Sequence, residues 1–173
     1  MRLLDERRAV TYTIVIGIWA IVAVYALLHD LYIVRIAPEH FTIFHPPLWG
    51  LSDPVALASG WAFKASIGPG LVLGVACAFV ARAGRRPRIP VGRVLIGGCV
   101  VVMMTEIVSA GAGFIAYRTQ APLYPEAWYP VRAVPILVTQ TIQISCYLSS
   151  AVFSALFLWA LVRRRRRLAT NPA

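Results

Sequence analysis

Two charged side chains lie inside otherwise apolar stretches of the chain, where they could form a polar site within a membrane. Lys64 falls within residues 55–81, and Glu106 falls within residues 94–116. An ionisable group is costly in a hydrocarbon layer, so it normally faces protein and has a partner. At about 1.5 Å per helical residue, each charge lies roughly 15 Å from the outer end of its stretch, near the middle of a ~30 Å core. The sequence therefore predicts that Lys64 and Glu106 meet at an internal polar site.

A polar stripe within residues 134–162 extends this predicted site. Gln140, Gln143 and Tyr147 recur at intervals of three and four, which is the period of one helix face. Amide and phenol groups donate and accept hydrogen bonds, so they could complete the hydrogen bonding of a buried ion pair. Two interpretations stay open: the polar groups only hold the helices together, or they bind or move a small solute, a proton or a metal ion.

Small residues beside the two charges predict close helix packing. They recur at intervals of four and comprise Ala56, Gly60 and Gly68 beside Lys64, and Thr105, Ser109 and Gly113 beside Glu106. Small side chains let two helix backbones approach each other within a membrane. We therefore expect the second and third helices to pack together. The first stretch is apolar almost all round, so we expect it to contact lipid or a partner subunit.

The composition is that of a membrane protein. The chain has 173 residues, 59% of them hydrophobic, and its mean hydropathy is +0.71. Four apolar stretches are near or above the ~20 residues needed to cross a hydrocarbon core. They span residues 10–28, 55–81, 94–116 and 134–162. We expect one all-α domain, residues 1–173, that forms an integral membrane four-helix bundle.

The first stretch has an alternative interpretation as a cleaved signal peptide. Its long apolar core and the acidic residues Asp5 and Glu6 in its leader favour an uncleaved membrane anchor instead. The four-span topology depends on this choice, because a cleaved leader would leave three spans.

Arginines predict the orientation of the spans. They concentrate in the leader, in the connection around residues 82–93 and in the run Arg163–Arg167. By the positive-inside rule, both termini and the middle connection are cytoplasmic, and residues 29–54 and 117–133 are the outer loops. We expect a multi-pass protein of the bacterial cytoplasmic membrane.

The net charge of +10 is explained by arginines that flank membrane spans. A nucleic-acid-binding protein needs its basic residues on a folded soluble face, so we expect no nucleic-acid partner. The run Arg163–Arg167 is instead expected to attract anionic lipids. A membrane protein partner or a second copy of this chain is the other partner that we consider.

The first outer loop gathers all three histidines of the chain. His29, Glu39 and His45 together would make a two-histidine, one-carboxylate ligand set for a divalent transition metal such as zinc, iron or copper. Asp30 or His40 could orient these ligands from an outer shell. The alternative is that the loop residues have only capping and local structural roles, because no compact motif such as H-E-x-x-H is present.

The same loop carries a family resemblance. The segments His29-Asp30, Glu39-His40-Phe41-Thr42 and His45-Pro46, followed by the turn 81–87, resemble an uncharacterised group of small bacterial four-span membrane proteins. That group has an H-D, E-Y-F-T, H-P loop and an A-R-A-G-x-R-P turn. The resemblance covers about the first half of the chain and implies the architecture and the shared loop, but no activity. This chain departs from the pattern at His40, where tyrosine is usual, and in its fourth span, where Gln140 and Gln143 occupy a region associated with a histidine.

Enzyme signatures are missing from the sequence. There is no G-x-S-x-G, and the glycines around Pro69 have the wrong spacing for a dinucleotide-binding loop. No histidine falls within the four predicted spans, so a haem held between paired histidines is not expected. We therefore expect a non-enzymatic membrane protein with an intramembrane polar site. A structural or assembly subunit is the alternative, and a membrane metalloenzyme that uses the outer loop is a weaker one.

Overall fold

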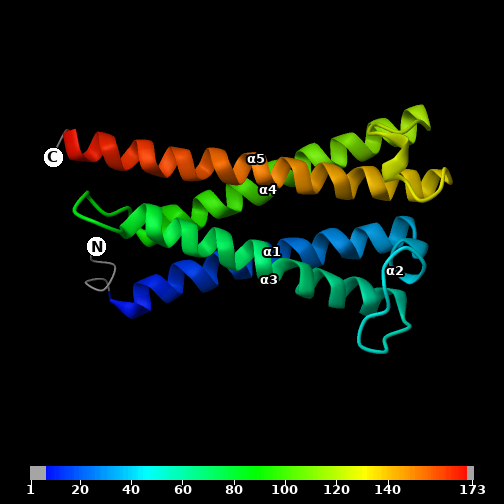
Figure 1. Cartoon of the computed structure of the whole chain (residues 1–173), viewed down its shortest axis with the longest axis horizontal. Helices are drawn as coiled ribbons and strands as arrows, with labels where there is room; N and C mark the ends of the chain where they lie inside the picture. The colour runs from blue at the N-terminus through cyan, green and yellow to red at the C-terminus, as the bar shows by residue number, and fades with distance from the viewer. Residues whose placement is uncertain (1–6, 171–173) are drawn as a thin grey trace.

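The computed structural model describes residues 7–170 and contains four long helices connected by short segments (Figure 1). The long helices are α1 (Arg8–Ile36), α3 (Pro54–Arg82), α4 (Val91–Thr119) and α5 (Val134–Thr170). Each is long and apolar enough to cross a membrane. A short helix, α2 (Glu39–Thr42), and a 3₁₀ turn, η2 (Glu126–Trp128), lie in the connections. The predicted all-α bundle is confirmed, and the described residues include no strand.

The helices extend beyond the apolar stretches that predict them. Hydropathy ends the first span at Leu28, whereas α1 continues to Ile36 and therefore includes His29 and Asp30. Helix ends are set by backbone hydrogen bonding and capping, which do not require apolar side chains. The start of α3 shows such a cap, because the Asp53 side chain accepts a 2.8 Å hydrogen bond from the backbone N–H of Ala56.

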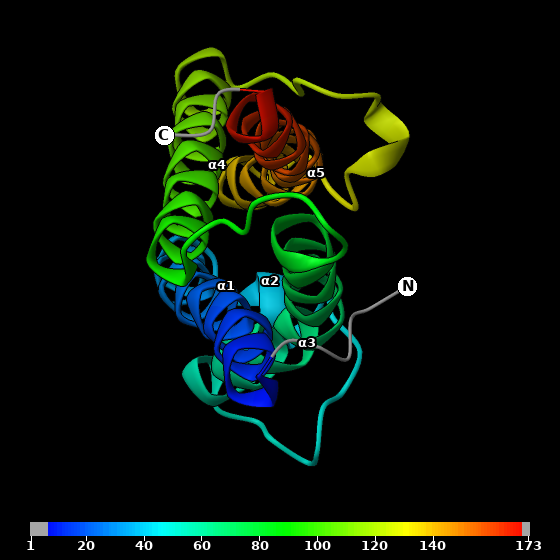
Figure 2. The same cartoon turned by 90° about the vertical axis from the view of Figure 1, so that its left-hand side faces the viewer.

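The four helices form two closely packed pairs. Helix α1 packs along α3, and α4 packs along α5, with smaller contacts between α1 and α4 and between α3 and α5. The view along the bundle shows the order α1, α3, α5, α4 around a ring (Figure 2). Helices α3 and α4 therefore lie diagonally opposite each other. The prediction that the second and third spans pack together is wrong.

The small residues explain this pairing, because they face other helices than expected. A side chain at Gly74 of α3 would place its Cβ 2.7 Å from the backbone oxygen of Val15 on α1. On α4, a Cβ at Gly113 would lie 2.3 Å from the Ile142 side chain of α5. By contrast, Gly68 has no atom within 4 Å of its Cβ position. Close approach is thus made between α1 and α3 and between α4 and α5. Helix α1, expected to contact lipid or a partner, packs on α3 and α4 and also keeps exposed apolar side chains such as Val24 and Leu28.

An apolar cluster fills each end of the bundle. One end, here called the terminal end, is where α1 begins and α5 finishes (Figure 1). Its cluster comprises Ile14, Ile18, Cys77, Ala78, Ala81, Ile89, Val94 and Leu161. The opposite end, the loop end, carries α2 and η2, and its cluster includes Phe41 and Leu48 of the connection after α1. The middle of the bundle lies between these two apolar layers.

Arg165 fastens α5 to the turn between α3 and α4. Its side chain is only 6% exposed. The guanidinium donates hydrogen bonds of 2.8–2.9 Å to four backbone carbonyls, those of Val80, Ala83, Arg86 and Pro87. The first two carbonyls belong to the last turn and the cap of α3, where helical carbonyls lack partners. Arg165 therefore faces protein, unlike Arg163, Arg164, Arg166 and Arg167, which are exposed.

Candidate intramembrane site

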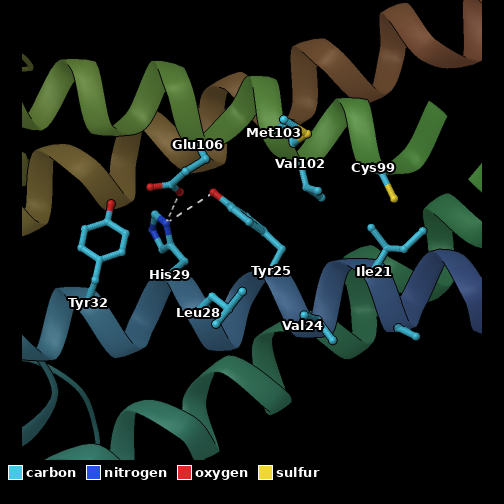
Figure 3. Close-up of a pocket in the computed structure, with 11 residues that line it drawn as sticks. Ile21, Val24, Tyr25, Leu28, His29, Tyr32, Cys99, Val102, Met103 and Glu106 are labelled. Atoms are coloured by element: carbon cyan, nitrogen blue, oxygen red, sulfur yellow. Dashed lines mark hydrogen bonds and ion pairs between the residues drawn. The ribbon is translucent and has the colours of Figure 1, made fainter. Parts of the chain in front are cut away.

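His29 and Glu106 form a hydrogen-bonded pair between α1 and α4 (Figure 3). Their Nδ1 and Oε2 atoms are 2.8 Å apart, although the residues are 77 positions apart in sequence. The His29 side chain is 3% exposed, and that of Glu106 is 34% exposed. Since an ionised carboxylate can only accept, Nδ1 of His29 carries the proton in this bond. Glu106 lies close to the midpoint of α4, so the pair lies well away from both ends of the bundle.

Two tyrosines flank His29 on the same face of α1. Tyr25, His29 and Tyr32 are spaced by four and three residues, so their side chains project toward α4 together (Figure 3). The Tyr25 hydroxyl lies 3.4 Å from Nδ1 of His29 and 3.2 Å from the sulfur of Cys146 on α5. The ring of Tyr32 meets that of His29 edge-on, with centroids 5.2 Å apart. The hydroxyl of Tyr32 is buried and has no hydrogen-bond partner.

Glu106 has a further polar neighbour on its own helix. The Ser109 hydroxyl lies 3.4 Å from Oε2 of Glu106 and 3.1 Å from its backbone oxygen. Ser109 belongs to the stripe of short residues noted in the sequence, and it is fully buried. The carboxylate is thus oriented from two directions, by His29 on α1 and by Ser109 one turn further along α4.

A central cavity of about 370 Å³ lies between all four helices, next to this pair. Its wall combines apolar residues with polar residues from every helix: Asp30 and His29 of α1, Ser66 of α3, Thr105 of α4, and Gln143, Tyr147, Ser150 and Ser154 of α5. Asp30 is buried and follows His29 directly in the sequence. A second carboxyl group therefore lines the same cavity as the His29 side chain.

A lateral groove of about 660 Å³ lies on the other side of the pair, between α1 and α4. Its length is lined by apolar side chains, among them Ile21, Val24, Leu28, Val102 and Met103, and its polar end is formed by Tyr25, His29, Tyr32 and Glu106 (Figure 3). Tyr25, His29 and Val102 line the lateral groove and the central cavity alike. These three side chains lie between the two spaces.

Lys64 does not take part in this site. It lies exposed on α3, with its ammonium 4.5 Å from the centre of the Trp61 ring. Trp61 is one turn closer to the loop end, so the lysine stem runs along the helix toward that end, as long cationic side chains do at membrane surfaces. The expected pairing with Glu106 is not formed, because α3 and α4 lie on opposite corners of the bundle. His29 takes the place predicted for Lys64.

The predicted stripe on α5 divides between two environments. Gln143 and Tyr147 line the central cavity, and the Gln143 amide nitrogen donates a 2.7 Å hydrogen bond to the Tyr147 hydroxyl. The amide oxygen of Gln143 is buried without a partner. Gln140 instead donates to the backbone oxygen of Trp128, at 3.0 Å, and so fixes the connection between α4 and α5. Two of the three predicted α5 residues thus reach the cavity beside Asp30.

The histidine and carboxylate set of the first outer loop is not assembled. His29 is engaged with Glu106, Glu39 is exposed on α2, and Nδ1 of His45 donates to the backbone oxygen of His40 at 2.7 Å. Between residues 7 and 170, no group of three or more histidine, cysteine, aspartate or glutamate side chains is placed to hold a metal ion. Asp30 and His40, the expected outer-shell residues, therefore have no set of metal ligands to orient within the described part of the chain.

His40 is a buried side chain of the loop end rather than a ligand. It is 1% exposed and packs edge-on against Phe41 and at a tilt to His45. Neither ring nitrogen has a hydrogen-bond partner. Burial, together with the neighbouring imidazoles of His45 and His29, lowers the pKa of His40 from 6.5 to about 4. The ring is therefore neutral at physiological pH.

His29 is the functional candidate that hydropathy assigned to the wrong environment. The apolar stretch stops one residue before it, so the sequence places His29 in an outer loop, whereas it lies inside α1. The signal that could have found it is the spacing of Tyr25, His29 and Tyr32 on one helical face.

Comparison with protein-family models, with curated proteins and with solved structures finds no match to this chain. The site is therefore interpreted from its own geometry and chemistry.

Proposed function

We propose that this integral membrane protein binds a small ligand and exchanges a proton with it at an intramembrane site formed by Asp30, His29 and Glu106. The observation that carries the proposal is the position of His29. Its imidazole is hydrogen bonded to Glu106 at the lateral groove and lines the central cavity together with Asp30. Ionisable residues inside membrane spans are typical of binding sites and proton relays.

Imidazole suits this position because its two nitrogens can serve different partners. Nδ1 is committed to the Glu106 carboxylate, and Nε2 is buried without a partner. A neutral imidazole accepts a proton at one nitrogen while it releases one from the other, at a pH near neutrality. A proton that arrives at Nε2 can therefore leave from Nδ1 to Glu106. His29 would connect the two cavities by proton transfer while its ring keeps them apart.

The apolar clusters support a ligand that is not a bulk aqueous ion. One cluster lies between the site and the terminal end, and the other lies between the site and the loop end. A site that opens toward the outer loop would not fit this arrangement, because Phe41 and Leu48 of that loop belong to the cluster that covers it. Entry of a ligand from the side, between the two helix pairs, agrees better with the positions of the lateral groove and the central cavity.

The location proposed for the protein is the bacterial cytoplasmic membrane, with both termini in the cytoplasm. The arginines of the turn after α3 and of the last turns of α5 lie at the terminal end of the bundle. A concentration of arginine at one end is typical of the cytoplasmic side. The exposed arginines of the run Arg163–Arg167 are then placed to meet anionic lipids, whereas Arg165 is not.

Infrared difference spectroscopy of the protein in lipid nanodiscs, between pH 5 and pH 8, tests the proposed proton exchange. Wild-type protein should show carboxyl bands that Asp30→Asn and Glu106→Gln each remove in part. Replacement of His29 by asparagine should shift the remaining carboxyl signal, because the imidazole couples both groups. Lys64→Met is the matched control for loss of an intramembrane charge and should leave the spectra unchanged. Wild-type spectra identical to those of the Asp30→Asn, Glu106→Gln double variant would overturn the proposal.

A further inference from the structure

The lateral groove between α1 and α4 has the size and the lining of a ligand site that faces the lipid. Its volume of about 660 Å³ falls within the ~300–1,000 Å³ range of small-molecule pockets. Leu28 and Met103, on its two walls, are each 63% exposed. Since these side chains belong to helices that can cross a membrane, the groove opens toward acyl chains rather than toward water.

The polar end of the lateral groove offers hydrogen-bonding groups that the protein leaves unused. The hydroxyl of Tyr32, which lines the groove, is buried and has no hydrogen bond. A buried polar group without a hydrogen bond costs about 1–3 kcal/mol. The partly exposed carboxylate of Glu106 lies between Tyr25 and Tyr32 and can only accept hydrogen bonds while it is ionised (Figure 3). The groove thus presents a phenol donor and a carboxylate acceptor side by side.

The depth and charge of this polar end exclude two common occupants. Phospholipid head groups stay at the membrane surface, about 15 Å from the midplane, whereas Glu106 lies near the midpoint of α4. An anionic head group would also be repelled by the Glu106 carboxylate. Hydrated solutes are disfavoured by the apolar walls and by the apolar clusters at both ends. The remaining candidate is a neutral molecule that dissolves in the hydrocarbon core and carries its own oxygen groups.

We propose that the lateral groove binds the ring of a lipid-soluble quinone or quinol from the bilayer; this inference rests on the site proposed above for the position of Tyr32 and Glu106, and not on proton transfer to the ligand. A ring carbonyl can accept a hydrogen bond from Tyr32, and a quinol hydroxyl can donate one to Glu106. The ring packs between Leu28, Val102 and Met103, and a thioether sulfur beside an aromatic ring is a favourable contact. The isoprenoid tail follows the apolar length of the groove toward Ile21 and Val24. The proposal concerns binding and involves no electron transfer.

Photolabelling with an azido-substituted decylubiquinone tests this inference on the full-length protein in lipid nanodiscs. Label should concentrate on the α1 and α4 peptides that line the groove, and unmodified decylubiquinone should displace it. Met103→Trp, which fills the groove, should reduce labelling at least tenfold. The matched control is Ile96→Trp, a residue of the same helix that is 66% exposed and does not line the groove. Tyr32→Phe, which removes one hydroxyl without filling space, should reduce labelling several-fold.

Results of two kinds, from the distribution of the label and from its displacement, would overturn the inference. Label spread over all lipid-exposed helices, or labelling unchanged in Met103→Trp, would show simple partitioning and overturn the inference. Displacement by a long-chain alcohol as effective as by decylubiquinone would also overturn it, because the groove would then accept any neutral amphiphile. Failure here is distinguishable from failure of the proposed proton exchange, because the infrared titration of Asp30 and Glu106 does not depend on the quinone.

Discussion

The imidazole of His29 lies 2.8 Å from the carboxylate of Glu106, and this bond connects the α1–α3 pair of helices to the α4–α5 pair. It is made where α1 and α4 have only limited contact, beside two cavities. A polar bond at this place sets the relative position of the two helix pairs as well as the chemistry of the site.

Removal of one partner of this bond should destabilise the protein more than removal of both. Glu106→Leu leaves Nδ1 of the buried His29 with only the long 3.4 Å hydrogen bond to the Tyr25 hydroxyl, at an expected cost of about 1–3 kcal/mol in the free energy of unfolding. The double variant His29→Phe, Glu106→Leu should recover part of this loss. Denaturant unfolding in detergent micelles, analysed as a double-mutant cycle, measures the coupling. Additive losses from the two single changes would contradict the bond.

Arg165→Lys should lower the free energy of unfolding by about 2–4 kcal/mol, because an ammonium cannot replace the planar guanidinium at four carbonyls. Arg164→Lys, one residue earlier and exposed, is the matched control and should change the stability by less than about 0.5 kcal/mol. Thermal melts in detergent compare the two variants. Equal melting temperatures for the two variants would show that the hydrogen bonds of the Arg165 guanidinium do not stabilise the protein.

Gly74→Ala should weaken the α1–α3 pair, because its Cβ would lie 2.7 Å from the oxygen of Val15, a backbone atom that cannot move aside. Overpacking of this kind costs about 1–3 kcal/mol. Gly68→Ala on the same helix is the control, since its Cβ meets nothing within 4 Å and alanine favours helix. The expected order of melting temperature is Gly68→Ala at or above wild type, and Gly74→Ala below it.

Acidification should destabilise the loop end through His40. Its pKa is about 4 in the folded protein and 6.5 ordinarily, so between these values the unfolded chain binds more protons than the folded one. The stabilisation is fully present above pH 6.5 and is lost as the pH falls toward 4, by about 3 kcal/mol in total. Unfolding free energies at pH 7.5 and pH 4.5 measure it. His40→Phe should flatten the dependence, and an unchanged slope in that variant would assign it to other groups.

Cysteine labelling should report the orientation of the bundle. In a background without the native cysteines, Ser52→Cys before α3 should react with a membrane-impermeant maleimide added outside intact cells. Arg85→Cys, in the turn after α3, should react only after the membrane is opened. Both positions are exposed in the structure, so access to the reagent is the variable measured. Reversed labelling would place the termini outside.

The sequence is sufficient to predict the four helices, because each has an apolar stretch of membrane-spanning length. It also selects Glu106, Gln143 and Tyr147 as residues of an internal polar site. The partner of Glu106 could not be obtained in the same way. Helical periodicity states which residues share a face, but the order of helices around the ring decides which faces meet, and that order depends on packing at Gly74 and Gly113.

His29 was misplaced for a different physical reason. Hydropathy measures where apolar side chains stop, whereas α1 continues for eight residues beyond Leu28. His29 and Asp30 in this last part do not mark a loop, since both are buried in the bundle and His29 has a hydrogen-bond partner on α4. The predicted metal ligands His29, Glu39 and His45 do not meet for a related reason. Residues that are close in a loop sequence are separated once part of that loop is helix, as His29 is in α1.

The hydrogen bonds between Arg165 and the turn after α3 have a consequence for biogenesis. Synthesis proceeds from the N-terminus, so α3, its turn and α4 enter the membrane before α5 has left the ribosome. Until then the carbonyls of Val80, Ala83, Arg86 and Pro87 lack the guanidinium that joins them in the mature protein. The first three long helices thus form an intermediate that lacks these hydrogen bonds, and the bonds form only when α5 packs against the other helices.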